Sequence, residues 1–181
     1  MAIAEQAARI AAFLDDHRVM SLATSGPNGP HAANLFYARD GFSLLWISGP
    51  ASEHSLHLQQ RARVAATIAA DCLDYADIKG LQIHGEAWRI VAPEACSHAR
   101  SRLEARFAFL RQIGNGPVAL RQAYANAEFY CLRPTRIVFI DNTRGFGFKE
   151  AIDLKEGLDF KESLDFKEGL DFEGEPAIVS H

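Results

Sequence analysis

Three side chains that could bind an anion lie close together where an apolar run ends and a helix is expected to begin. Ser48 ends the apolar run, Ser52 is a typical helix N-cap, and His54 follows within the first turn. Hydroxyl groups, an imidazole and the free backbone N–H groups of a helix start suit a ligand such as a phosphate. An ordinary strand, turn and capped helix would leave the same pattern, so both interpretations stay open at this point.

Short strands joined by tight turns are expected around this stretch. Residues 19–25 and 31–39 flank a Gly-Pro-Asn-Gly-Pro turn, and an Asp-Gly pair leads into a third strand at 42–48. Further short apolar segments are strand candidates at residues 64–72, 79–91, 128–132 and 136–140. The first of these could instead extend the helix before it. Three segments have the apolar spacing of amphipathic helices, namely residues 4–17, 52–61 and 94–110.

Strands in hairpins with helices inserted at two connections favour one fold class. We expect a mainly β domain of the α+β type, a six-stranded antiparallel Greek-key split barrel with a few peripheral helices. Alternating β and α units with a parallel sheet are not indicated. A chain of 181 residues suits one globular domain with an appendage.

Charge and cysteine content exclude several classes of function. The net charge is −4, but residues 149–175 hold four Lys against ten Asp and Glu, so the rest of the chain is nearly neutral. A nucleic-acid-binding protein would need a concentrated Lys and Arg face. The three cysteines lack the paired spacing of a disulfide framework or a zinc site. With no apolar run of membrane-spanning length, we expect a cytoplasmic protein that binds neither nucleic acid nor membranes.

The chain from residue 149 onward repeats the pattern Lys-Glu-x-Leu-Asp-Phe with a period of six. In a helix, six residues advance by about 240°, so the apolar positions would scatter around the axis. In a strand, the fourth and sixth residues of each unit share one face. We therefore divide the chain into a barrel domain at residues 1–148 and an acidic hexapeptide-repeat tail at 149–181. A solvated extension is expected, with edge-strand addition or docking on another subunit as the alternative.

Four segments together resemble one family. They are ANLFY at 33–37, LWIS at 45–48 followed by Ser52 and His54, KGLQIHGE at 79–86, and DNTRGFG at 141–147. In order and spacing they are similar to the pyridoxamine 5′-phosphate oxidase-like flavin-binding split barrels, and within them to the YhbP-like bacterial branch. The resemblance implies a homodimer with FMN in a groove between the subunits. It also implies an FMN-dependent oxidoreductase that uses hydride transfer at flavin N5 on an unknown small substrate.

The resemblance implies roles for six residues. Ser48, Ser52 and His54 would lie near the FMN phosphate, although family members commonly have Lys or Arg near the position of His54. A neutral imidazole is a weaker partner for a dianion, so the affinity for FMN is expected to be lower or pH-sensitive. Lys79 would supply a compensating charge or face the N1–C2=O side of the ring. The amides of Asn34 and Gln82 would face the pyrimidine edge.

Other functions and other residues stay open. The alternatives to an enzyme are a noncatalytic protein that binds flavin or haem and an interaction module with an empty barrel. His54 and His57 have a spacing that can chelate, but no third ligand is fixed, so no metal is expected. His31, His84 and Arg89 are weaker candidates for substrate contact. No side chain is assigned as an essential acid or base.

Overall fold

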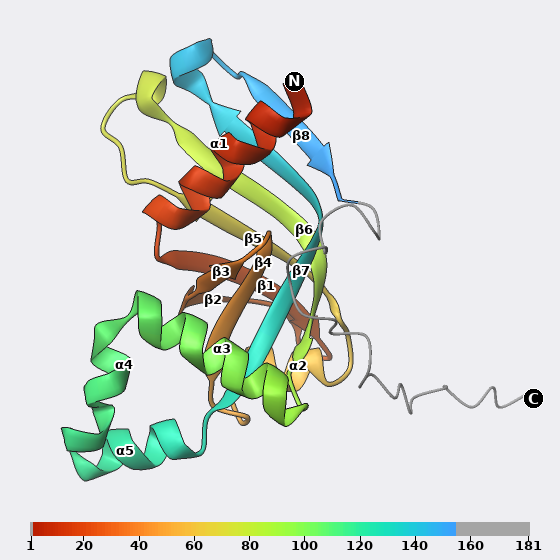
Figure 1. The fold of residues 1–181 in the computed structure, drawn as a ribbon. Coiled ribbons are helices and arrows are strands. Elements are labelled where there is room, and N and C mark those ends of the chain that lie inside the picture. Colours follow the sequence, from red (N-terminus) through yellow and green to blue (C-terminus); the bar gives the residue numbers. More distant parts are fainter. Residues whose placement is uncertain (1, 155–181) are drawn as a thin grey trace, which may run out of the picture.

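A computed structural model describes residues 2–154, which form one antiparallel sheet with helices at its two ends (Figure 1). The strands are β1 Val19–Gly26, β2 Gly29–Phe36, β3 Ala38–Asp40, β4 Ser43–Ser48, β5 Arg63–Ala69, β6 Lys79–Arg89, β7 Glu128–Asp141 and β8 Lys149–Asp153. The α-helices are α1 Ala2–Asp16, α2 Glu53–Leu58, α3 Pro93–Arg106, α4 Ala108–Gln112 and α5 Val118–Ala125. Short 3-10 turns are η1 Tyr75–Asp77, η2 Ile113–Asn115 and η3 Asn142–Arg144.

The sheet has the order β2-β1-β5-β6-β7-β4-β3, and β8 pairs with β7 beyond this path. Every pairing between neighbours is antiparallel, which confirms a mainly β antiparallel half-barrel with several helices. The expected count of six strands is wrong, because the described residues contain eight. The segment expected at 31–39 breaks at Tyr37 into β2 and β3, and the segments at 128–132 and 136–140 are one continuous strand, β7.

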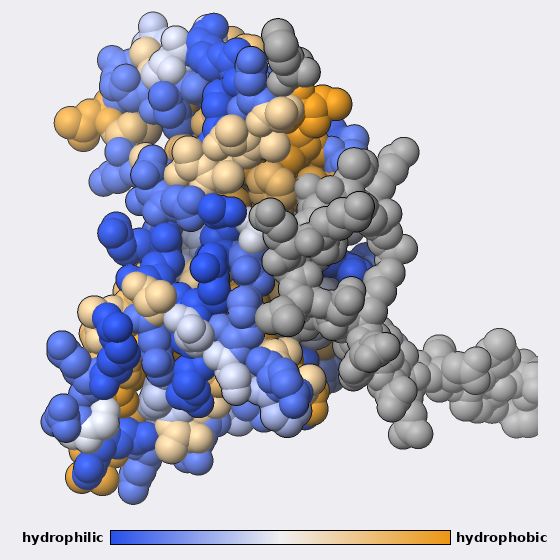
Figure 2. Space-filling model, viewed as in Figure 1, coloured by the Kyte–Doolittle hydropathy of each residue, from blue (hydrophilic) through white to orange (hydrophobic). Residues whose placement is uncertain are grey.

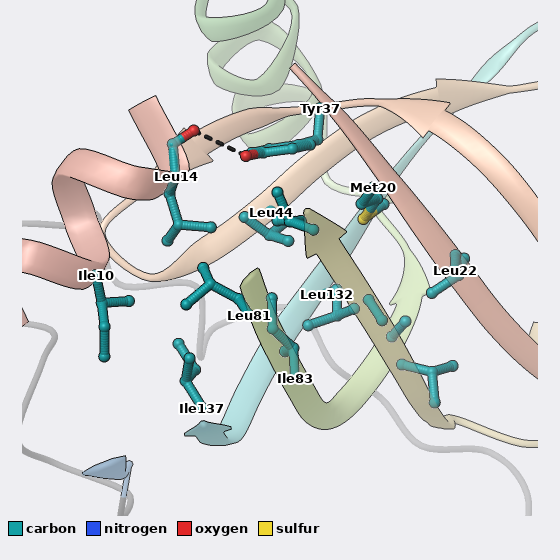
Figure 3. Close-up of a cluster of buried hydrophobic side chains, with 14 of the residues drawn as sticks. Ile10, Leu14, Met20, Leu22, Tyr37, Leu44, Leu81, Ile83, Leu132 and Ile137 are labelled. Carbon is teal, nitrogen blue, oxygen red and sulfur yellow. Dashed lines mark hydrogen bonds between the residues drawn. The ribbon is translucent and has the colours of Figure 1, made fainter. Parts of the chain in front are cut away.

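One face of the sheet packs against α1. Ile10 and Leu14 of α1 are fully buried against Leu81 of β6 and Ile137 of β7 (Figure 3). The hydroxyl of Tyr37 donates to the carbonyl of Leu14 at 2.8 Å, which fixes the end of the helix over the sheet. Figure 2 shows that apolar side chains gather on the surface where α1 lies. The predicted amphipathic helix at residues 4–17 is therefore confirmed.

A second apolar cluster lies under α3 at the other end of the sheet. Leu103 and Phe107 pack on Leu45 of β4 and on Phe129 of β7. The helix expected at 94–110 ends at Arg106, because Phe107 leaves the helical conformation and α4 begins at the next residue. This end of the sheet carries α2 as well, and it is the end where β4 finishes.

A glycine makes the close pairing of β6 and β7 possible. The register between these strands shifts between His84 and Gly85. A Cβ atom on Gly85 would lie 2.3 Å from the carbonyl oxygen of Arg133, so no larger residue fits there without a shift of the backbone. Gly85 therefore allows the two backbones to approach closely at the register shift.

Strand β8 comprises most of the first repeat unit of the tail. Its residues pair with β7 from Arg136↔Asp153 to Ile140↔Lys149, and Ile152 is buried in the core beside α1. The sheet therefore continues past the domain boundary expected at residue 148. The first repeat unit is therefore added to the sheet as an edge strand and is not a solvated extension. The expectations for residues 155–181 lie outside the described residues.

Within residues 2–154, no helix is long and apolar enough to cross a membrane.

Candidate functional site

Ser48, Ser52 and His54 come together where β4 runs into α2. Nε2 of His54 lies 2.7 Å from Oγ of Ser48 and 3.0 Å from Oγ of Ser52. The two serine hydroxyls are 3.3 Å apart. The sequence placed these three residues near one another along the chain, and the turn between the strand and the helix brings their polar atoms to one point. We call this group, together with Ser55, the serine–histidine cluster.

Ser55 belongs to the cluster but was not singled out from the sequence. Ser52 precedes α2 as its N-cap residue, yet its side chain makes no capping hydrogen bond to the helix backbone. Its hydroxyl instead donates to Oγ of Ser55 at 2.8 Å. The three-residue spacing from Ser52 was a readable signal, because residues three apart on a helix are neighbours. The expected side-chain cap is replaced by a chain of hydroxyl groups.

Burial keeps His54 neutral. The side chain is almost inaccessible to solvent, and desolvation lowers the pKa of His54 below its ordinary value of 6.5. The nearby His31 and His57 lower it further. A neutral ring presents one donor and one acceptor nitrogen, so Nε2 either accepts from a serine hydroxyl or donates to one. The cluster is uncharged in its resting state.

Two further histidines and a carboxylate support this cluster from the β1–β2 hairpin and from α2. Nδ1 of His31 is 3.2 Å from a carboxylate oxygen of Glu53, and Nδ1 of His57 is 3.0 Å from Oγ1 of Thr24. A Cβ atom on Gly26 would lie 2.2 Å from the ring of His57. Glycine is therefore required at position 26 if the buried imidazole of His57 is to keep its place.

An ion pair lies on the neighbouring strands at this end of the sheet. Nη1 of Arg89 is 2.6 Å from Oε1 of Glu128, and Glu128 stands opposite Ser48 in the pairing of β7 with β4. The hydroxyl of Tyr130 donates to the other oxygen of Glu128 at 3.2 Å. Burial raises the pKa of Tyr130, and its hydrogen bond with Ser55 opposes that rise. The guanidinium of Arg89 is thus close to the cluster but is already paired with a carboxylate.

Asn34 and Gln82 lie on the other, solvent-exposed face of the sheet. Ser21 of β1 stands opposite Asn34 on one side and opposite Thr67 on the other, and Thr67 stands opposite Gln82. The four side chains therefore form one row across β2, β1, β5 and β6, which we call the polar row. Within it, the hydroxyl of Ser21 donates to Oδ1 of Asn34 at 2.7 Å.

The row contains both predicted amides and two residues that the sequence did not indicate. Ser21 and Thr67 belong to it only through strand register, which no local pattern encodes. Asn34 and Gln82 are three strand spacings apart, or about 14 Å. In one chain, only one of these two amides can therefore face a given pyrimidine edge.

Lys79 does not lie near the serine–histidine cluster in one chain. It begins β6, whereas Arg89 ends β6 at the cluster's end, so roughly 30 Å of strand separates the two positions. Nζ of Lys79 is 3.5 Å from a carboxylate oxygen of Asp141. The expectation that Lys79 compensates for the missing charge near His54 fails within a single chain, because β6 is extended between them.

The distinctive segment at 141–147 forms a turn that caps β7. Oδ1 of Asp141 accepts hydrogen bonds from the backbone N–H and the hydroxyl of Thr143, at 3.1 and 2.6 Å. The side chain of Asn142 donates to the carbonyl of Tyr75 and accepts from the N–H of Gly147. These contacts make the segment an Asx turn that caps the end of β7. Across residues 2–154, no group of three or more His, Cys, Asp or Glu side chains is arranged to hold a metal ion.

The antiparallel half-barrel places this protein in the class of pyridoxamine 5′-phosphate oxidase-like folds. Its similarity to known proteins identifies the family. The family model described as pyridoxamine 5′-phosphate oxidase matches residues 7–141. A UPF0306 protein of Klebsiella pneumoniae is 32% identical over 149 residues, which cover 78% of this chain and 89% of that protein. The chain belongs to the pyridoxamine 5′-phosphate oxidase family, within its UPF0306 group, so the resemblance read from four sequence segments is confirmed.

Solved structures share the fold at low sequence identity. The structure of a heme binding protein from Mycobacterium smegmatis aligns with a TM-score of 0.63 and 22% identity, covering 83% of this chain and 57% of that chain. A putative pyridoxamine 5′-phosphate oxidase from Listeria innocua aligns with a TM-score of 0.57 and 17% identity, covering 73% of this chain and 95% of that chain. These similarities establish the fold alone.

Proposed function

We propose that this protein binds FMN, with the phosphate at the serine–histidine cluster. The observation that carries the proposal is the convergence of three hydroxyl groups and one imidazole, in a chain whose family commonly binds flavin. Hydroxyl groups can each donate one hydrogen bond to a phosphate oxygen, and bonds to charged acceptors are stronger than bonds between neutral groups. The donor set suits a phosphate monoester.

The cluster would have to change its hydrogen bonds to hold the phosphate. In the described structure the hydroxyls of Ser48 and Ser52 bond to His54 and Ser55, so their protons would turn toward the ligand. Protonation of His54 places a hydrogen on Nε2, so the ring would donate to Ser48 and leave the Ser48 proton free for the ligand. The proton of Ser52 would still have to turn away from Ser55. A dianion beside the ring stabilises the protonated form, so phosphate binding and proton uptake by His54 are coupled.

The polar row and the homodimer belong to the same proposal. Beside the row, the exposed face carries small uncharged side chains, among them Ala23, Ala32 and Ala69. These side chains are uncharged, and charged residues are depleted at the cores of protein interfaces. We propose that this face meets a second copy of the chain and that the ring of FMN lies at the seam, facing Asn34 or Gln82 with Lys79 supplied across it.

The proposed activity is that of an FMN-dependent oxidoreductase acting on a small substrate whose identity is open. Bound flavin supplies hydride and electron transfer through its ring system. The residues of this chain would anchor the phosphate, orient the ring and exclude water from one face of it.

Titration of FMN and of riboflavin into cofactor-free protein tests the proposal. We expect quenching of flavin fluorescence with FMN and at least tenfold weaker binding of riboflavin, which lacks the phosphate. We also expect the affinity for FMN to increase as the pH falls from 7.5 to 6, and this increase to disappear in His54→Gln. Equal affinity for the two ligands would mean that the phosphate does not bind at the cluster. No binding of either ligand would contradict the FMN proposal and leave a haem-binding protein or an interaction module as the alternatives.

The second candidate is a protein that binds haem or a related ring. Its specific support is the fold similarity to the heme binding protein from Mycobacterium smegmatis, together with three histidines at one end of the sheet. Titration with haemin, followed by the absorbance of the haem near 400 nm, distinguishes the two candidates. A saturable spectral change that FMN does not compete away would favour haem.

Light scattering of the eluting protein tests the homodimer separately. We expect a mass of two chains for the wild type and of one chain for Ala23→Arg, because a long charged side chain would stand in the middle of the proposed interface. Ser97→Arg, on the exposed side of α3, is the matched control and should remain dimeric. A wild-type protein that elutes with the mass of one chain would contradict both the proposed dimer interface and the FMN site shared across it.

A further inference from the structure

Among the contacts that hold strand β8 in place, three are made by side chains at different positions of the first repeat unit. Glu150, the second residue of the unit, accepts two short hydrogen bonds from Arg9 of α1, at 2.7 and 2.9 Å. Ile152, the fourth residue, is buried in the core under α1. Asp153, the fifth residue, pairs with Arg136 of β7 at 2.8 Å.

Every later unit of the tail repeats the residues that make these contacts. The second position is Glu in all of them, at Glu156, Glu162 and Glu168. The fourth position is Leu158, Leu164 and Leu170, and the fifth is Asp159, Asp165 and Asp171. The third position, which stands on the opposite face from Ile152, is small in all four units, at Ala151, Gly157, Ser163 and Gly169. The later units therefore carry the same types of residue at the positions that contact α1 and β7 in the first unit.

The period of six preserves the orientation of every side chain. Successive residues of a strand point to opposite faces, so a shift by an odd number of residues would turn the apolar positions outward. A shift by six keeps the apolar positions toward α1 and the Glu beside Arg9. The same shift replaces Ile152 by a leucine and Leu154, which packs against the core, by a phenylalanine. Each apolar position of the first unit is therefore matched by an apolar residue in the later units.

The position of β8 in the sheet makes exchange feasible. The second half of β7 pairs with β6 on one side and with β8 on the other, and β8 pairs with no other strand among the described residues. An edge strand can leave without breaking any pairing except its own. Docking a later unit lengthens the connection from β7 by six residues per step, and the entropy of loop closure rises only slowly with length.

We propose that the place beside the second half of β7 is a docking site for any one of the four repeat units of the same chain. The tail is bound at this site through one unit at a time, and it moves through the site in steps of six residues. The free length of chain beyond the sheet then changes in the same steps, while the fold of the barrel stays the same.

Three variants of the full chain test the proposal by thermal unfolding. Ile152→Asp removes the apolar contact of the first unit, and we expect its Tm to fall by less than about 3 °C because a later unit takes the place of the first. The triple variant Leu158→Asp, Leu164→Asp, Leu170→Asp should unfold within about 2 °C of the wild type. All four substitutions together should lower the Tm by on the order of 10 °C, because no unit can then fill the core. A loss in Ile152→Asp alone as large as in the quadruple variant would overturn the proposal.

Disulfide trapping gives a direct measurement of which unit docks. Val138 stands opposite Ala151 in the register of β7 with β8, so cysteines at these two positions should form a disulfide. In a Cys72→Ala background, Val138→Cys with Ser163→Cys should also link within one chain, and Ile152→Asp should increase the yield several-fold. Val138→Cys with Glu162→Cys is the control, because that side chain would face α1. No link to position 163, or a link found only between two chains on a non-reducing gel, would contradict docking within the chain.

Discussion

The serine–histidine cluster and the polar row contain five of the six residues that the sequence assigned to one cofactor, but the two groups differ in burial and in hydrogen bonding. The serine–histidine cluster is buried or half-buried, and its polar atoms bond to one another. The polar row is exposed, and of its four members only Ser21 and Asn34 share a hydrogen bond among those observed within the row. The cluster is complete within one chain, whereas the row gains a partner only when something lies on the outer face of the sheet.

This contrast separates two contributions to binding. A ligand at the cluster must replace hydrogen bonds that already exist, so its net gain is smaller than the number of new bonds implies. A ligand or a second chain at the row displaces only water from neutral side chains. We therefore expect substitutions in the cluster to change both stability and phosphate affinity, and substitutions in the row to change binding alone.

The largest expected effect is on FMN affinity when the cluster loses a hydroxyl. Ser52→Ala should weaken FMN by about 1.5–3 kcal/mol, the value of a hydrogen bond to a charged group. Riboflavin affinity should not change, because riboflavin has no phosphate. Isothermal titration of both ligands measures the difference, with Ser97→Ala as the control. An unchanged dissociation constant for FMN would place the phosphate elsewhere.

The next effect is on the free energy of unfolding when the support of the cluster is overpacked. Gly26→Ala places a methyl group against the buried ring of His57 and should cost about 1–3 kcal/mol. Gly49→Ala is the control, because a Cβ atom at Gly49 would have no heavy atom within 4 Å. Urea unfolding of the two variants gives the comparison. Equal losses in both would mean that His57 moves aside without cost.

A smaller effect is expected from pH, and its sign follows from His54. Burial lowers the pKa of His54 in the folded chain below the ordinary value of 6.5, so the unfolded chain takes up this proton first on acidification. Stability should be fully present above pH 6.5 and should fall as the pH drops below it, by at most about 1.4 kcal/mol per pH unit for this proton. His54→Gln should remove this part of the slope in urea unfolding at pH 7.5 and 5.5. If the dependence of stability on pH is unchanged in His54→Gln, it does not come from His54.

The smallest effect is expected in the polar row. Thr67→Ala and Gln82→Ala should each change the free energy of unfolding of the cofactor-free protein by no more than about 0.5 kcal/mol, because both side chains are exposed. The same variants should weaken flavin binding if the row faces the ring. A row variant that lowers stability as much as Gly26→Ala would remove the distinction between the two regions.

Local residue patterns were sufficient to predict the serine–histidine cluster but not the polar row. Ser48, Ser52 and His54 lie within seven residues of one another, so the breaker and the short helix between them had few ways to be arranged. Ser21, Asn34, Thr67 and Gln82 come from four strands, and their alignment depends on three registers. Register follows from the burial of a whole strand face, which no single motif records.

The sequence by itself determined the antiparallel class, the amphipathic helix before the first strand, the family and the three residues at the end of β4, because each depends on short-range periodicity or on a contiguous motif. Only the tertiary structure decided that Lys79 and His54 lie at opposite ends of the sheet and that Asn34 and Gln82 lie in one exposed row. It also decided that residues 149–153, which belong to the first repeat unit of the tail, form a strand of the sheet. The physical reason is that a strand's place depends on which partners bury its apolar face, and those partners are far away in the chain.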